Sequence, residues 1–382
     1  MTETTRSTES SASGATLYLA CELGSTKWTL GFTVAPAQRP RLRQIAAGDT
    51  GALGQEIVAA KRRFGLAIDA PVRSCYEAGR DGFWVHRWLV TAGIANVVVE
   101  SSSIEVNRRA RRAKTDRQDA CKLLALLQRW AGGEARVWSV VHVPTPEAEA
   151  QRQLTREIST VSEDRTRARN RIHAVLATQG IRLALTPRFL DLVAEAQTGD
   201  GRPLAPAWRA RLAREWAYLK MIESRLRTLK AERAAQIAEG QDRVADVARR
   251  LCTVRGVAEV SAAVFSAELF GTRTFANGRQ LGALTGLVPV PYRSDQGVRD
   301  QGISKAGRPE VRRLALQLAW GWLRWQPTSA LALWFRRRFD AAGGRSKRVG
   351  IVALARKLVI ALWRYVEHGV VPDGAVLKLV RP

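Results

Sequence analysis

In the first third of the chain, short runs of apolar residues alternate with longer segments of helical periodicity. Alternation and short buried runs predict strands at residues 17–23, 28–35, 42–46, 72–77 and 95–100. Spacing by threes and fours predicts helices at 53–64 and 84–92, and a further helix from near Thr115. Three strands followed by strand–helix alternation indicate a mixed α/β sheet.

The middle of the chain has a different periodicity. Two long segments with apolar residues at helical spacing are separated by a Gly- and Pro-containing break at residues 198–206. Arg165 interrupts the first seam. The two seams consist of Leu154, Ile158, Val161, Ala168, Ile172 and Val175, and of Leu212, Trp216, Leu219, Leu226 and Leu229. Narrow seams of this length predict an antiparallel helical hairpin or an oligomerising coiled coil.

From about Val247 the chain is predicted to be mainly helical. Residues 253–269 have a helix–Gly turn–helix pattern, which predicts an element resembling a helix-hairpin-helix. Backbone amides near such a turn can face a phosphate. The resulting division is a structureless tail at 1–15, an α/β domain at 16–135, a helical hairpin at 146–245 and a mainly α domain at 246–370.

The net charge of the chain indicates what kind of partner it binds. The chain has 61 Lys and Arg residues against 35 Asp and Glu residues, a formal net charge of +26. Such an excess repels itself in a compact state, so a polyanion is the simplest partner: DNA or RNA first, with an anionic membrane as the alternative. The excess is steepest from Arg293 to the end, with 18 basic and six acidic residues. No apolar run is long enough to span a membrane.

Other features bear on compartment and metal chemistry. The first residues lack the apolar core of a secretory signal. The four histidines are scattered, so a zinc site is not expected. A cytoplasmic protein with reduced thiols is predicted, because no C-x-x-C pair occurs among the widely spaced Cys21, Cys75, Cys121 and Cys252.

Four acidic residues lie at the ends of predicted elements in the α/β domain. Glu22 is near the end of the first strand and Glu77 closes a later one, where sheets of this class present their sites. Asp116 and Asp119 are three residues apart, on one side of the following helix. Converging carboxylates repel one another unless a hard divalent cation binds them, most often magnesium in phosphoryl-transfer sites. The alternative is that each acid pairs with an arginine.

A family resemblance rests on the segments YLACELGSTKW, SCYEAGRDGFW, SSSIEVNRRARRAKTDRQDA and LGALTGLVPVPYRSDQGVRDQGISKAGRPEVRRL. They resemble the insertion-sequence transposases that combine a RuvC-like DEDD domain with a serine-bearing domain, the bridge-RNA-guided recombinases of insertion-sequence family one-ten. The match is collinear over residues 16 to 370 or so. The KTDR-x-DA block and the GL-x-P…S…GISK-x-G block are specific when they occur in this order.

The resemblance implies an RNase H-like (RuvC-like) fold for the N-terminal domain and a bound Mg²⁺ ion, for which Mn²⁺ can substitute. It assigns four metal-binding catalytic acids, Glu22, Glu77, Asp116 and Asp119, and places Ser294 at the family's nucleophilic serine. It also implies donor and target DNA, a structured non-coding guide RNA, and a homo-oligomer, either a dimer or a tetramer.

The chain departs from the family pattern at three places. Glu22 stands where aspartate is usual, and it keeps the charge while reaching about one methylene further. Asp295 stands where glycine is expected, which places an acid beside a nucleophile that attacks phosphate. Arg308 and Pro309 replace the more usual glycine and asparagine after the ISK block.

A serine hydroxyl is a poor nucleophile at neutral pH and needs a base or a metal to activate it. Ser294 has Arg293, Arg299 and Lys305 nearby in sequence to neutralise a phosphate, but no histidine. The resemblance implies a composite site of carboxylates, metal and serine, from one protomer or two, in which Ser294 becomes linked to DNA. On its residues alone, Ser294 is equally a turn serine. Ser304 is the rival nucleophile, and it is predicted instead to cap the next helix.

Basic clusters are the candidate nucleic-acid contacts. One precedes the KTDRQDA acids, one surrounds the serine and one lies near the C terminus. The predicted contacts are Arg108, Arg109, Arg111, Arg112, Lys114, Arg293, Arg299, Lys305, Arg336, Arg337 and Arg338. Arginines on the outer faces of the two long helices either bind phosphates as well or form an ordinary solvated surface.

Together these observations predict a DNA transposase that cuts and rejoins DNA through a metal-assisted serine under RNA guidance. Two alternatives stay open at this point. One is a RuvC-like two-metal nuclease that acts on branched DNA without a covalent intermediate. The other is a non-catalytic nucleic-acid-binding protein whose acids are salt-bridged. A Ser294→Ala variant separates the first two, and carboxylate variants separate both from the third.

Overall fold

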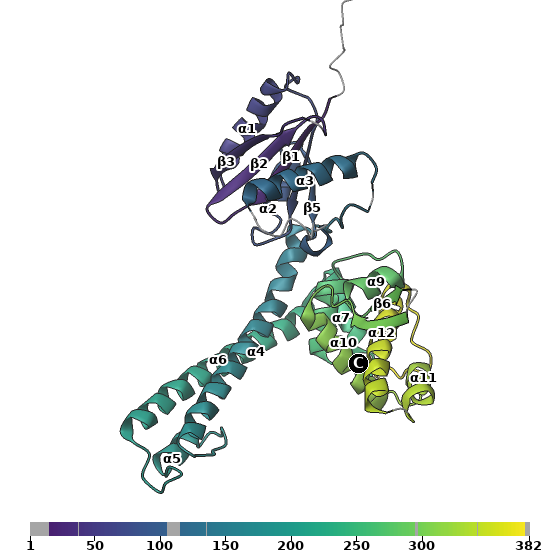
Figure 1. The fold of residues 1–382 in the computed structure, drawn as a ribbon. Coiled ribbons are helices and arrows are strands. Elements are labelled where there is room, and N and C mark those ends of the chain that lie inside the picture. The colour runs from purple at the N-terminus through teal and green to yellow at the C-terminus, as the bar shows by residue number, and fades with distance from the viewer. Residues whose placement is uncertain are drawn as a thin grey trace, which may run out of the picture. The chain divides into compact units, whose positions relative to one another are not determined.

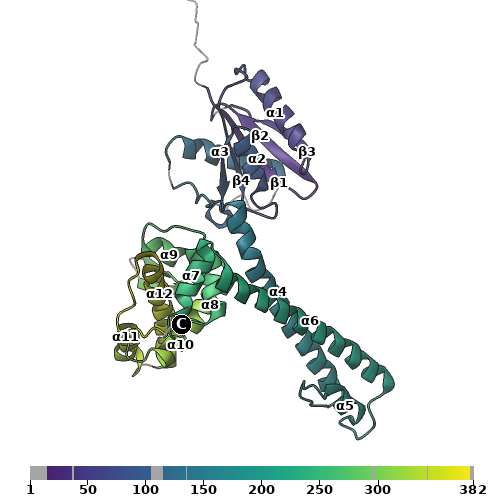
Figure 2. The ribbon, with the colours of Figure 1, turned by 180° about the vertical axis from the view of Figure 1, so that it is seen from behind.

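The computed structural model describes residues 15–36, 38–104, 115–134, 136–294, 297–341 and 343–378, and for residues 291–301 it describes the backbone alone. The chain divides into two compact units, Met1–Val143 and Pro144–Pro382 (Figures 1 and 2). The first unit contains a mixed sheet covered by helices, and the second is mainly helical. No helix in the described part of the chain is long and apolar enough to cross a membrane.

The sheet of the first unit confirms the predicted mixed α/β architecture. Among the described residues its strand order is β3-β2-β1-β4-β5. The pairs β1–β2 and β2–β3 are antiparallel, whereas β1–β4 and β4–β5 are parallel. The bounds are β1 Leu17–Leu23, β2 Lys27–Thr33, β3 Arg41–Ala46, β4 Val72–Glu77 and β5 Ala95–Val99. Each strand agrees with its predicted position to within two residues.

Helices cover both faces of the sheet, and each face has its own apolar core. Successive side chains of a strand point to opposite faces. Leu19 and Cys21 of β1 therefore pack with α1 (Thr50–Arg63) and α2 (Trp84–Thr91), and Ala20 packs with α3 (Asp116–Ala131). Helix α1 begins before its predicted start, because Asp49 caps it by accepting a 2.8 Å hydrogen bond from the Ala52 amide. A short 3₁₀ turn, η1 (Ser101–Ser103), follows β5.

The predicted helical hairpin is the first part of the second unit. Its long helices are α4 (Pro146–Thr178) and α6 (Pro206–Glu239), with α5 (Phe189–Ala194) at the far end (Figure 1). The helices are antiparallel, because Arg171 on α4 pairs with Glu215 early in α6 and Glu157 pairs with Arg225 further along. Both predicted apolar seams are buried against each other within one chain. They therefore need no second chain to cover them.

The rest of the second unit is a helical bundle around the buried Trp322, Phe265 and Phe270. The predicted helix–Gly turn–helix is present, but its first helix precedes Thr253. Helix α7 ends at Cys252, Gly256 takes a φ of +90° in the turn, and α8 follows. The bounds are α7 Arg243–Cys252, α8 Glu259–Phe265, the π-helical η2 Ser266–Phe270, α9 Gly278–Leu284, α10 Pro309–Trp325, α11 Ala330–Phe339 and α12 Gly344–His368.

A two-stranded hairpin interrupts these helices. Strand β6 (Pro289–Ser294) pairs antiparallel with β7 (Gly297–Ile303), and Ser294 stands opposite Gly297 as the last pair before the turn. We call β6 and β7 the serine hairpin. The serine hairpin was not predicted. Proline has no amide proton to donate to a neighbouring strand, so a segment with two prolines such as VPVPYRS does not have the pattern of a strand.

Candidate active site

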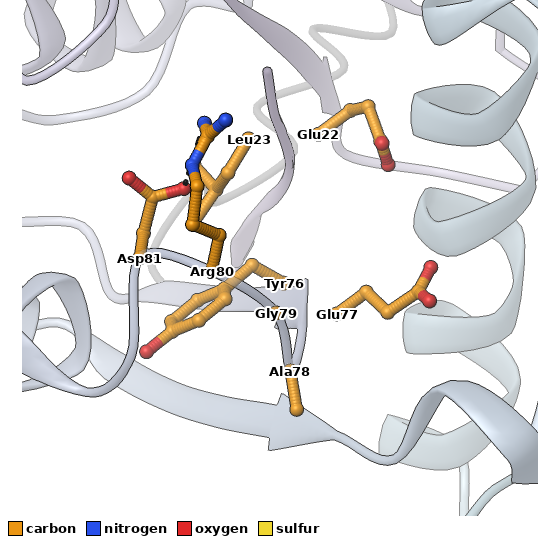
Figure 3. Close-up of a pocket in the computed structure, with 8 residues that line it drawn as sticks. All are labelled: Glu22, Leu23, Tyr76, Glu77, Ala78, Gly79, Arg80 and Asp81. Carbon is orange, nitrogen blue, oxygen red and sulfur yellow. Dashed lines mark ion pairs between the residues drawn. The ribbon is translucent and has the colours of Figure 1, made fainter. Parts of the chain in front are cut away.

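Strand pairing brings Glu22 and Glu77 together. Strands β1 and β4 are parallel, and Cys21 stands opposite Tyr76 in their register. Glu22 and Glu77 come one step further along the two strands, so they lie side by side. Alternation places both on the face covered by α3, the face to which Ala20 and Cys75 contribute. Figure 3 shows the two carboxylate groups pointing to the same side.

A cavity of about 160 Å³ adjoins this pair, and it is lined by Glu22, Leu23 and residues 76–81. Glu22 is half-buried and Glu77 is exposed, so solvent and ions reach both. The Tyr76 hydroxyl donates a 2.9 Å hydrogen bond to the Gly82 carbonyl and fixes the loop that closes the cavity. In that loop Arg80 pairs with Asp81 at 3.7 Å, and in Figure 3 both point away from the two glutamates.

Arg80 and Asp81 also line this cavity, although neither was predicted as a site residue. The available signal was the segment GRDG directly after Glu77, because a Gly-flanked charged pair after a strand is typical of a loop at the sheet edge. The loop adds one cation and one further carboxylate to the lining.

The first turn of α3 carries the other two predicted acids. Thr115 caps the helix by accepting a 3.3 Å hydrogen bond from the Gln118 amide. Asp116 is exposed and Asp119 is half-buried. Both interact favourably with the positive end of the helix dipole, which is one reason for acidic residues to begin a helix.

Contacts of α3 locate this turn relative to the glutamates. A Cβ on Gly31 would lie 3.6 Å from the Ala120 carbonyl oxygen, an ordinary van der Waals separation, so α3 packs directly on β2 at this position. Arg117 lines a small cavity together with Thr29, and Thr29 is the register partner of Glu22. Helix α3 therefore begins over the end of the sheet that carries Glu22.

The donor set is the type that Mg²⁺ prefers, because all four predicted ligands are carboxylates. The structure brings Glu22 and Glu77 to one cavity and places Asp116 and Asp119 on the helix that covers the same face. As they stand, the described residues contain no group of three or more His, Cys, Asp or Glu side chains that could hold a metal ion. Two of the four acids are thus adjacent, and the other two are not part of the same cavity lining.

The predicted nucleophile lies in the second unit, at the closing pair of the serine hairpin. The side chains of Ser294, Arg293 and Arg299 lie outside the described residues. The same is true of the whole basic cluster before α3, namely Arg108, Arg109, Arg111, Arg112 and Lys114.

The prediction that Ser304 caps the next helix is wrong. Helix α10 begins at Pro309 and its N-cap residue is Arg308. The Ser304 amide instead donates a 2.9 Å hydrogen bond to the Val288 carbonyl and closes the base of the serine hairpin. Gly307 packs against the Leu284 carbonyl at a positive φ, a position without room for a side chain. The GISKAG segment therefore turns the chain between the hairpin and α10.

The remaining basic candidates are on the surface. Lys305 is exposed. Arg336, Arg337 and Arg338 are exposed in the last turn of α11, where successive side chains point in different directions. On the hairpin, Arg167 pairs with Glu163 and Asp164, so that arginine belongs to a solvated, charge-paired face.

Known proteins share this sequence organisation. The family model described as Transposase IS116/IS110/IS902 family matches residues 248–333, from α7 through the serine hairpin to α11. The "putative transposase y4rJ" of Sinorhizobium fredii (strain NBRC 101917 / NGR234) is 38% identical over 376 residues, 95% of this chain and 94% of that protein. The transposase for insertion sequence element IS1328 of Yersinia enterocolitica is 28% identical over 242 residues, 60% of this chain and 68% of that protein. The chain therefore belongs to the insertion-sequence transposases of the IS116/IS110/IS902 family.

Proposed function

We propose that this transposase cuts and rejoins DNA through Ser294, with Mg²⁺ bound by Glu22, Glu77, Asp116 and Asp119. The observation that carries the proposal is the strand register that sets Glu22 beside Glu77 on the face covered by α3. Two exposed or half-buried carboxylates on adjacent strands are a starting point for a cation site. A divalent cation there would polarise a phosphodiester and stabilise the attacking and leaving oxygens.

The sheet also supports a RuvC-like assignment for the first unit. Its order is β3-β2-β1-β4-β5, with three antiparallel strands and two strands added in parallel. This is the arrangement expected of the RNase H-like fold that the sequence motifs imply. The acids at the ends of β1 and β4 and on α3 then occupy the positions where that fold would carry a carboxylate site.

Ser294 would act as the nucleophile on DNA. Its hydroxyl oxygen forms a bond to phosphorus, its proton is released, and the bond from phosphorus to the leaving sugar oxygen breaks as that oxygen takes up a proton. The resulting phosphoserine link conserves the bond energy for rejoining to a second DNA end. The position of Ser294 at the closing pair of a β-hairpin supports this role, because the tip of a hairpin projects from its base.

RNA guidance and self-assembly complete the proposal. A formal charge of +26 favours backbone contacts with both DNA and a structured non-coding RNA, and base pairing would then select the sequence. The proposal of a dimer or tetramer rests on the family motifs alone, because the apolar seam between α4 and α6 is buried within one chain.

Substitution of one glutamate tests the carboxylate site. We expect Glu77→Gln to abolish strand transfer between an element end and its target while DNA binding is retained, because an oxygen ligand loses its charge. The matched control is Asp69→Asn, which removes one exposed acid before the start of β4 at the opposite end of that strand. Mg²⁺ should also raise the melting temperature of the wild type and of the control but not of Glu77→Gln. Strand transfer at the wild-type rate in Glu77→Gln would remove Glu77 from the site.

A further inference from the structure

A buried glutamate organises a cluster of arginines in the second unit. Glu268 lies in the π-helical turn η2, and only 4% of its side chain is exposed. It accepts two hydrogen bonds from Arg156 of α4, at 2.9 and 3.2 Å. Arg308, which precedes α10, approaches the same carboxylate oxygen at 3.3 Å. One carboxylate thus holds two guanidinium groups side by side.

Two further arginines, Arg152 and Arg273, interact electrostatically with Glu268 and Arg156. Arg152 is 4% exposed, and it donates to the Ala267 carbonyl at 3.2 Å and to the Thr272 hydroxyl at 3.1 Å. The Nε atom of Arg273 is buried and meets no acceptor in the described part of the chain. Burial lowers the pKa of both guanidinium groups from the usual arginine value. We call Arg152, Arg156, Arg273 and Arg308 the arginine cluster.

Positive charge is in excess here. Four guanidinium groups interact with Glu268, and two further carboxylates act on them: Glu310 lies 3.3 Å from Arg308, and the charge of Glu149 partly offsets the burial that lowers the pKa of Arg152. The four guanidinium groups thus still outnumber these three carboxylates. Partly buried charge of one sign is costly unless an anion compensates it. Arg156 and Arg308 each keep 36% of their side chains exposed. A guanidinium carries five N–H donors, so each retains donors that can face solvent.

We propose that Arg156 and Arg308, aligned by Glu268, bind a backbone phosphate of a nucleic acid beside η2. Arginine forks match phosphate oxygens in two-point contacts, and a fork that is already fixed loses little entropy on binding. Glu268 is then a positioning residue. Arg308 is also one of the departures from the family pattern, because the motif usually has glycine at this position.

The inference rests on the proposed function only in taking the ligand to be a nucleic acid. Its test measures the affinity of the full chain for a labelled DNA duplex and for a labelled RNA stem-loop between about 50 and 200 mM salt. Removing one phosphate contact should reduce the slope of log affinity against log salt by about 0.7 to 0.9. We expect this reduction in Arg308→Gln and in Arg156→Gln, with one of the two ligands or with both. The ligand affected identifies the source of the phosphate.

Arg249→Gln is the matched control. Arg249 is similarly exposed, at 38%, but its Nη1 atom donates to the carbonyls of Ile237 and Gly240 and its Nη2 atom pairs with Asp246, which is no part of the arginine cluster. Its removal should therefore leave the slope unchanged. Arg308→Lys keeps the charge and should keep the wild-type slope, which separates a lost contact from a folding defect.

An unchanged slope in Arg308→Gln, with a lowered melting temperature, would show that the arginine cluster only stabilises the fold. That result would overturn the inference. A wild-type protein that bound neither ligand would instead contradict the proposed function itself.

Discussion

Single residues in this transposase show how burial sets the charge that a side chain can carry. His86 on α2 belongs to a hydrogen-bonded chain in which Ser74 Oγ donates to Asn96 Oδ1 at 2.8 Å. The Asn96 amide nitrogen then faces His86 Nδ1 at 2.8 Å. Because this nitrogen of Asn96 is a donor, His86 Nδ1 must accept, and the neutral imidazole is the form that fits. Burial, and secondarily the charge of Arg87, lowers the pKa of His86 below its usual value.

A pH dependence of stability follows from this network. The unfolded chain binds a proton at His86 near pH 6.5, whereas the folded chain resists it until the pH is lower. The stabilisation is therefore complete above about pH 6.5 and declines as the pH falls below it. His86→Gln can still accept from Asn96 but does not titrate. Its melting temperature should fall less than that of the wild type between about pH 7 and 5. Parallel curves for the two proteins would exclude His86 as the titrating group.

How far sequence could predict individual residues depends on whether their partners are local. Glu22 and Glu77 could be singled out because one is next to the end of a strand and the other ends a strand, and a strand end is visible in the alternation of nearby residues. Glu268 was not predicted, because it lies in the apolar run AAVFSAELF and its partners Arg156 and Arg308 are 112 residues before it and 40 after it. No local pattern indicates that a charged residue in such a run has a buried arginine partner.

Among the elements, the α4–α6 hairpin owes its stability to a single apolar seam. Leu219 is fully buried in that seam, whereas Met221, two residues away, is 60% exposed. Leu219→Asp should cost about 3 kcal/mol or more, because it buries a charge and removes apolar contacts. Met221→Asp is the matched control and should stay within about 0.5 kcal/mol of the wild type. Urea denaturation of both variants measures the difference, and equal losses would show that the seam does not carry the hairpin.

Element positions were predictable where periodicity was long or where capping was explicit. The seams of α4 and α6 gave two helices of more than 30 residues, and Thr115 marked the start of α3. The serine hairpin escaped prediction because Pro289 and Pro291 weaken the strand signal and the segment is short. The prediction that Ser304 caps α10 was wrong for a related reason. A serine before a helix usually caps it, but here the chain makes an additional turn through Gly307 before α10 begins.

For the whole molecule, the charge of +26 favours a nucleic-acid partner, and the division into two units separates the residues of the proposed site. The four predicted acids belong to the first unit and Ser294 to the second, so the proposed chemistry would need both units on one stretch of DNA, from one protomer or from two. The order of the sequence motifs along the chain predicts that the acids and the serine lie in different domains, and the proposed roles of these residues stay predictions. The motifs could not predict which side chains approach one another, because residues far apart in the sequence are brought together by the fold and not by any local pattern.

A covalent DNA–protein link is the most direct test of the central claim. After reaction with Mg²⁺ or Mn²⁺ and full denaturation, DNA should stay attached to the chain, and proteolysis should map the link to the peptide containing PYRSDQGVR. The link should be absent in Ser294→Ala and in Asp116→Asn, and present in Ser304→Ala, which removes a hydroxyl from the base of the same hairpin. Efficient strand cleavage by Ser294→Ala, leaving free 3′-hydroxyl and 5′-phosphate ends, would contradict the account and make water the nucleophile of a two-metal nuclease.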